Sequence, residues 1–170
     1  AKGLGEPSIP RIQVVMAEKF YITTAISYPN GAPHIGHAYE VVAADAIARF
    51  KRIDGYDVFF MTGTDEHGLK IQQAATRNGT TPRAFVDAMA PKFRDMAVRL
   101  NCSFDRFIRT TDADHLESTH ELWRRMEANG DIYLSKYSGW YSIRDEAYYG
   151  EGELTLQPDG SRIAPTGTPV

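Results

Sequence analysis

The order of local patterns near the start of the chain constrains its fold most. Residues 20–26 (FYITTAI) are rich in β-branched and aromatic side chains and stop at a cluster of turn formers, 27–31 (SYPNG). A helix is expected from Gly36 to Ile53, and the short apolar run 57–61 (DVFFM) is typical of a strand covered on both faces. This order predicts a right-handed βαβ unit. We therefore expect an α/β fold, a Rossmann-like parallel sheet with helices on both faces.

The first predicted helix carries apolar side chains on nearly all its sides, including Val41, Ile47 and Phe50, and we expect it to be mostly buried. A Thr-Pro pair, Thr81-Pro82, predicts the N-cap and the first residue of a later helix. The other expected elements follow in chain order: a helix over 70–77, the capped helix to about Leu100, a strand over 106–110, and a helix from Thr111 or Asp112 to Asn129.

A jump in aromatic content marks a boundary near residue 131. We expect residues 20–130 to form the first half of the Rossmann-like domain and residues 131–170 to be the start of a β-rich insertion, truncated before its end. We interpret residues 1–19 as an extension or a remnant of expression, because their first fifteen residues carry Gly, Pro and mixed charge without a period.

Charge and cysteine content exclude several classes of protein. The net charge of −3 and the pI near 6.0 argue against a free-standing nucleic-acid binder, because nonspecific affinity for phosphate backbones comes from clustered Lys and Arg. Cys102 is the only cysteine, which excludes an intrachain disulfide, and we expect it to be a small buried filler. No run is long and apolar enough for a membrane helix, and we expect a cytoplasmic protein with no membrane partner.

Two histidines, in the sequence His34-Ile35-Gly36-His37, lie where the first loop becomes the first helix. Both imidazoles then lie near the free N–H groups at the positive end of the helix, which is a favourable place for phosphate. Gly36 lets a ligand approach the backbone, and each histidine can donate a hydrogen bond to a phosphoryl oxygen. The alternative is a structural histidine pair, but the position beyond the carboxyl end of a strand favours a ligand site.

A carboxylate follows the second strand, in the segment 62–68 (TGTDEHG). Because parallel strands end at one edge of a sheet, Asp65 is expected beside the two histidines, where it could hold a substrate ammonium group. The alternative is a turn in which Asp65 and Glu66 cap the next helix. The pairing of the two motifs at one edge favours a site, and His67 is ambiguous between turn and site.

These motifs carry a resemblance to a known family. Residues 24–37 (TAISYPNGAPHIGH) and 63–68 (GTDEHG) resemble the methionyl-tRNA synthetases, and the likeness runs from about Phe20 to the end. The resemblance implies a methionine–tRNA ligase, in which ATP with Mg²⁺ activates L-methionine to methionyl adenylate and the methionine is transferred to tRNA(Met). No protein nucleophile is required, so catalysis would come from positioning and from donors aimed at charge developing on the phosphate.

The resemblance also implies roles for individual residues. Four would border ATP, and the two histidines among them would be catalytic: His34, Gly36, His37 and Glu40. Three would form the methionine site: the backbone of Ile26 and the side chain of Asp65 would hold the ammonium group, and Tyr28 would line the pocket.

The sequence departs from the family pattern in two respects. Many relatives carry zinc-binding cysteine pairs in the insertion, but residues 137–149 contain none, so we predict a zinc-free member without a structural metal. The family's Lys-Met-Ser-Lys-Ser loop, which completes the triphosphate site, does not occur in the 170 residues, and neither does the helical anticodon-binding domain. We therefore expect half of an active site, no activity of the chain alone, and tRNA contacts largely outside it.

Two other functions stay open at this point. A small adenylyl- or cytidylyltransferase uses a similar histidine signature on a similar sheet, although the Asp65 segment and the aromatic insertion argue against it. The missing loop supports a non-catalytic alternative, a truncated or split synthetase-like module that binds a partner. His115 and His120 are expected on a solvated helix face, and the aromatic residues from Trp123 to Tyr149 are expected in core or interface positions.

Overall fold

The computed structural model describes residues 17–170, and the predictions for residues 1–16 lie outside this part of the chain. By their contacts, the residues form two compact units, and the chain passes from the first to the second between Leu122 and Trp123. The domain boundary expected near residue 131 stays a prediction. None of the helices between residues 17 and 170 has the length and apolar character that crossing a membrane requires.

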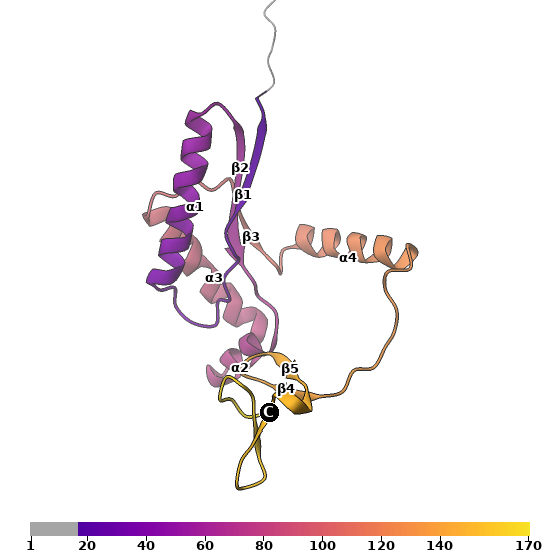
Figure 1. Cartoon of the computed structure of the whole chain (residues 1–170). Helices are drawn as coiled ribbons and strands as arrows, with labels where there is room; N and C mark the ends of the chain where they lie inside the picture. Colours follow the sequence, from indigo (N-terminus) through magenta and orange to yellow (C-terminus); the bar gives the residue numbers. More distant parts are fainter. Residues whose placement is uncertain (1–16) are drawn as a thin grey trace, which may run out of the picture. The chain divides into compact units, whose positions relative to one another are not determined.

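The first unit is built on a three-stranded parallel sheet (Figure 1). Its strands lie in the order β1 (Lys19–Thr23), β2 (Asp57–Thr64) and β3 (Arg106–Arg109), and α1 (Ile35–Ile53) connects the first two. The chain passes from β2 to β3 through α2 (Leu69–Arg77) and α3 (Pro82–Arg99), and α4 (Ala113–Ala128) follows β3. The parallel βαβ unit and the α/β fold class are therefore confirmed.

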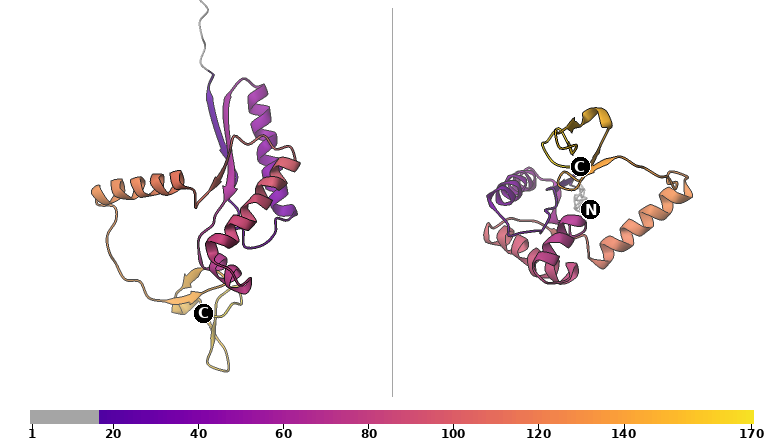
Figure 2. Two further views of the ribbon diagram at one scale, coloured as in Figure 1. Left: turned by 180° about the vertical axis from the view of Figure 1, so that it is seen from behind. Right: turned by 90° about the horizontal axis from the view of Figure 1, so that it is seen from below.

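The core of this unit lies between the sheet and two helices, α1 and α3, which occupy the same side of the sheet (Figures 1 and 2). Ala48 of α1, Phe60 of β2 and Ala97 of α3 are buried together, and Cys102 packs partly buried against them. On the opposite face Tyr21 and Phe59 stack on each other and remain 58% and 45% exposed. The expectation that β2 is covered on both faces is therefore wrong for residues 17–170.

Helix α1 is half-buried rather than mostly buried. Val41 and Ala48 face the sheet and α3, whereas Ile47 and Phe50 are exposed, Phe50 by 62%. The prediction is wrong because apolar residues on all sides of a helix do not tell which side is packed. Among residues 17–170, the buried residues of α1 lie on the side that packs against the sheet and α3.

The strand ends differ from those predicted, and the differences shape the carboxyl edge of the sheet. β1 ends at Thr23 because the amide of Ala25 donates to the Glu40 carboxylate of α1 and not to β2. β2 continues to Thr64, and its Gly63 is required for packing, because a Cβ there would lie 2.0 Å from the carbonyl oxygen of Ile108. Asp65 therefore directly follows the last residue of the central strand.

The second unit contains two antiparallel strand pairs, which agrees with the predicted β-rich insertion. The pairs are β4 (Trp140–Ser142) with β5 (Ala147–Tyr149) and β6 (Thr155–Leu156) with β7 (Arg162–Ile163), with the short 3-10 helix η1 (Glu151–Glu153) between them. Tyr148 contacts Tyr137 and Tyr141 but is half exposed, and Trp123 is exposed too. These aromatic residues therefore do not form a buried core, and an interface role stays a prediction.

Candidate active site

His34 and His37 cap the N-terminus of α1 reciprocally. The Nδ1 atom of His34 accepts the amide of Gly36 at 3.1 Å, and the Nδ1 atom of His37 accepts the amide of His34 at 3.1 Å. The two rings stack with centroids 3.8 Å apart. Because an accepting Nδ1 carries no proton, the proton of each neutral ring is on Nε2, where it can be donated. The structural and ligand-binding roles considered for this pair are therefore compatible.

Gly36 gives the capping ring of His34 its space. A Cβ at this position would lie 3.0 Å from Cε1 and 3.1 Å from Nδ1 of His34, which is tighter than ordinary van der Waals contact. The glycine thus leaves room for the capping ring, and the close approach of a ligand predicted at Gly36 stays a prediction.

His37 is partly buried against α3, where the Phe93 ring meets it edge to face with centroids 5.1 Å apart. Burial lowers the pKa of His37 below its ordinary value of 6.5, and the neighbouring His34 lowers it further, whereas Glu40 acts in the opposite direction. The neutral form is also the form that capping requires, because a protonated Nδ1 could not accept the amide of His34. At neutral pH His37 is therefore a hydrogen-bond donor without a charge.

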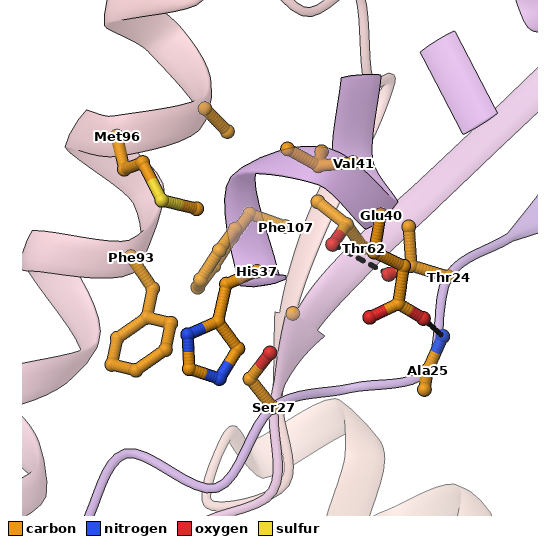
Figure 3. A pocket seen from close by; sticks show the side chains of 12 residues that line it. Thr24, Ala25, Ser27, His37, Glu40, Val41, Thr62, Phe93, Met96 and Phe107 are labelled. Atoms are coloured by element: carbon orange, nitrogen blue, oxygen red, sulfur yellow. Dashed lines mark hydrogen bonds between the residues drawn. The ribbon is translucent and has the colours of Figure 1, made fainter. Parts of the chain in front are cut away.

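A small cavity lies beside His37, between the end of β1, α1 and α3 (Figure 3). Its volume of about 20 Å³ accommodates a water molecule but not an amino acid. In its wall the Glu40 carboxylate accepts the amide of Ala25 at 2.9 Å, and the hydroxyls of Thr24 and Thr62 share a hydrogen bond of 2.7 Å. Glu40 thus ties the end of β1 to α1, and the ATP contact predicted for it stays a prediction.

The loop after β1 remains attached to β2 at the carboxyl edge. The amide of Ser27 donates to the carbonyl of Gly63 at 3.1 Å, and the amide of Asp65 donates to the carbonyl of Ser27 at 2.9 Å. This bridge brings Ile26 and Asp65 to the same edge. Within residues 17–170 the Asp65 carboxylate has no hydrogen-bond or ion-pair partner, and no backbone hydrogen bond uses the carbonyl of Ile26. Both acceptors are therefore available to a ligand.

Tyr28 and His67 lie on the two segments that carry these acceptors. The Tyr28 ring is partly exposed, with the Lys70 ammonium nitrogen 5.9 Å from its centroid. His67 is exposed, and its Nε2 lies 3.2 Å from the carbonyl oxygen of Thr110. His67 thus contacts the end of β3, while Tyr28 presents an aromatic face beside Asp65's segment.

Glu66 has a role that the sequence interpretation missed. Its buried carboxylate accepts from Thr64, Thr111 and Arg109, so it does not cap α2. The N-cap of that helix is Gly68, which makes no side-chain hydrogen bond. The capping interpretation of Asp65 and Glu66 is therefore wrong. The signal that could have indicated two of these partners is the position of Arg109 at the end of the third strand and of Thr111 just after it, at the same sheet edge.

A parallel sheet with a βαβ crossover, whose carboxyl edge carries two imidazole donors at a helix N-terminus and an unpaired carboxylate, has the architecture of the Rossmann-like class. A family model described as tRNA synthetases class I (M) matches residues 20–158. The chain belongs to this family, and the resemblance drawn from its two motifs is confirmed.

Individual relatives agree with the family match. Methionine–tRNA ligases of Brucella suis and Mycobacterium bovis are 58% and 62% identical to the chain over 153 and 152 residues, which is 90% and 89% of its length. The Mycobacterium tuberculosis methionyl-tRNA synthetase, solved in complex with methionyl-adenylate, is 61% identical and superposes with a TM-score of 0.82 over 89% of the chain. The chain spans about 30% of the length of these relatives.

The titration of His37 tests the electrostatic description of this site. A ring titration followed by NMR should give a midpoint below 6.5, and Phe93→Ala, which exposes the ring, should move the midpoint up. Glu40→Gln should move it down, because the Glu40 carboxylate favours the protonated ring. Between the lowered pKa and 6.5 the unfolded chain binds more protons, so stability should fall as pH decreases through that interval. A midpoint at or above 6.5 would contradict the described burial of the ring.

Proposed function

We propose that the chain is the amino-terminal catalytic part of a methionine–tRNA ligase. In this function ATP with Mg²⁺ activates L-methionine to methionyl adenylate, and the methionine is then transferred to tRNA(Met). The observation that carries the proposal is the pairing, at one sheet edge, of the two histidine donors with the unpaired Asp65 carboxylate. Its support is family membership and relatives of about 60% identity that are methionine–tRNA ligases.

Methionine would be bound on the β2 side of the edge. An ammonium group has three donors and no acceptor, so it suits a site with a carboxylate and a free carbonyl. Asp65 and the backbone carbonyl of Ile26 supply these two acceptors on adjacent strand ends. Tyr28, on the loop that follows Ile26, would line the pocket for the rest of the amino acid.

The phosphates would lie on the α1 side of the edge. An oxygen of the methionine carboxylate attacks the α-phosphorus of ATP, the new P–O bond forms, and the bond to pyrophosphate breaks with the electron pair leaving on pyrophosphate. Nε2 of His34 and of His37 would donate to the phosphoryl oxygens on which charge develops, and the first turn of α1 at Gly36 would add its positive end. Glu40 would border the nucleotide. No proton transfer from the protein is needed.

The chain would supply only part of this site. The Lys-Met-Ser-Lys-Ser loop is absent from its 170 residues, so we expect the chain alone to be inactive, with tRNA contacts mostly elsewhere. The setting this function implies is the cytoplasm. Family membership argues against a small nucleotidyltransferase. A truncated or split module without activity of its own remains the alternative, and methionine-dependent exchange in a full-length enzyme carrying this segment would exclude it.

We further propose that the insertion is held by a hydrogen-bonded carboxylate in place of zinc. Asp145 accepts the hydroxyls of Thr166, Thr168 and Tyr149, and the hydroxyl of Ser142 accepts its amide. Hydrogen bonds from Thr166 and Thr168 are the main cause of an Asp145 pKa of about 2. Hydroxyls and one carboxylate are not the thiolate and imidazole ligands that structural zinc requires, so this donor set does not fit the metal.

Replacing His37 tests the catalytic role. In a full-length enzyme carrying this segment, His37→Ala should lower the rate of methionine-dependent ATP–pyrophosphate exchange by about 10²- to 10³-fold, because it removes a donor to developing charge. Methionine affinity, measured by equilibrium binding, should change much less. His120→Ala, in an exposed part of α4, is the control and should be active. Exchange at the unchanged rate would remove His37 from the mechanism.

Replacing Asp145 tests the zinc-free insertion. Asp145→Asn should increase amide hydrogen exchange across residues 140–169, because the carboxylate that accepts three hydroxyls is lost. Asp159→Asn removes the same charge from a local turn contact with Ser161 and should have little effect. Because the Asp145 pKa is lowered, its contribution should be present above about pH 4 and lost as pH falls toward 2. Protection that needs added zinc or disappears with a chelator would overturn the proposal.

A further inference from the structure

The ion pair between Glu66 and Arg109 belongs to the carboxyl edge of the sheet, but the proposed function assigns it no role. The Glu66 side chain is completely buried, and that of Arg109 is 23% exposed. Arg109 binds the carboxylate in a fork, with Nε 2.7 Å from Oε1 and Nη2 2.9 Å from Oε2. The hydroxyl of Thr64 donates to Oε1 at 2.8 Å, and that of Thr111 donates to Oε2. Both oxygens therefore accept from two donors each.

The same arginine connects the pair to α3. Nη2 of Arg109 also donates to Oδ1 of Asp87 at 2.6 Å, and Asp87 accepts from Nε of Arg83 at 2.9 Å. Hydrogen bonding to Glu66 is the largest cause of a raised Arg109 pKa, so the guanidinium charge is secure at any working pH. The ends of β2 and β3 and the first turns of α3 are thus joined through one side chain.

The backbone on either side of Asp65 is fixed by these contacts. The Asp65 amide donates to the carbonyl of Ser27 at 2.9 Å, and the Glu66 amide donates to the hydroxyl of Thr110 at 2.8 Å. The Thr64 side chain is held by Glu66 itself. The Asp65 carboxylate, in contrast, has no partner of its own within residues 17–170. Its direction is therefore set by its neighbours in the chain.

We propose that the Glu66–Arg109 pair is a positioning element that holds the backbone of Asp65 and so aims its carboxylate at the substrate ammonium group. This inference rests on the proposed function of Asp65. A buried carboxylate must be fully paired to be tolerated, and a planar guanidinium fork satisfies it in one arrangement. A site held in its binding geometry before the ligand arrives avoids the cost of ordering it on binding. The pair lies beside Asp65 and does not contact the two histidines, so its loss should affect methionine more than the phosphates.

The test uses a full-length enzyme that carries this segment. Glu66→Gln keeps the shape of the side chain but removes its charge and one acceptor, and it should raise the KM for methionine roughly tenfold or more, with kcat and the KM for ATP changed by less than about threefold. Arg109→Lys keeps the positive charge but loses the forked hydrogen bonds, and it should also raise the KM for methionine. Thr111→Val removes one donor and preserves the ion pair, so it supplies a milder variant if Glu66→Gln does not fold.

Asp45→Asn is the matched control. Asp45 is also a buried carboxylate, and it accepts from Arg49 and from Ser103, which precedes β3 and lies toward the opposite edge of the sheet. The Asp45→Asn substitution should lower the melting temperature, as Glu66→Gln does, but leave the KM for methionine unchanged. A purely structural role for Glu66 would give the two variants the same kinetic behaviour.

The outcomes separate the inference from the function on which it rests. A methionine KM that rises in Glu66→Gln or in the milder variants, and not in Asp45→Asn, supports the positioning role. An active parent enzyme in which none of the Glu66, Arg109 and Thr111 variants changes this constant overturns the inference and leaves the proposed function standing. A parent enzyme without methionine-dependent exchange overturns both.

Discussion

The capping of α1 by its own histidines is the interaction on which the site depends. The first amides of a helix have no partner inside the helix, and here two of them are accepted by imidazole Nδ1 atoms. This satisfies the backbone, fixes the orientation of both rings, and leaves a proton on each Nε2. The neutral state of His37 follows from the same contact and from burial beside Phe93. One local requirement of helix formation thus produces two directed donors at the positive end of a helix, where phosphate is bound most favourably.

The parallel sheet places the acceptor groups of the site at the same edge as these donors. β1 and β2 end at the same edge, and the Ser27–Thr64 bridge holds the departing loop against β2 after regular pairing has stopped. Donors therefore gather at α1 and acceptors at Ile26 and Asp65. In the proposed function methionine fits this division, because its ammonium group would face the acceptors while its carboxylate faces the phosphate. Glu40 keeps the two halves together, because its carboxylate joins α1 to the end of β1.

Local signals in the sequence were sufficient for the framework but not for the contacts that complete it. Thr81 and Pro82 begin α3 as predicted, with the Thr81 hydroxyl accepting the amide of Ala84. The placement of Asp65 at the edge followed from strand order alone. The ion pair of Glu66 did not, because its partner is 43 residues away and a carboxylate before a helix looks like a cap. The half-exposure of α1 was missed for a related reason, since periodicity does not identify which apolar side meets a neighbour.

Two buried carboxylates paired with arginine lie toward opposite edges of this sheet, and stability alone does not explain both. Removing a carboxylate from water costs energy that an ion pair seldom returns in full, so an apolar pair of similar size would serve the core at least as well. An apolar pair cannot fix the orientation of the backbone beside it, because dispersion contacts allow small displacements. The two hydrogen bonds of a forked guanidinium do not allow them. At Asp45 the directed bonds fasten the turn at Ser103 to α1. At Glu66 they fasten the residue next to Asp65, whose carboxylate has no partner within residues 17–170. The same costly ion pair therefore orients a binding group at the proposed methionine site.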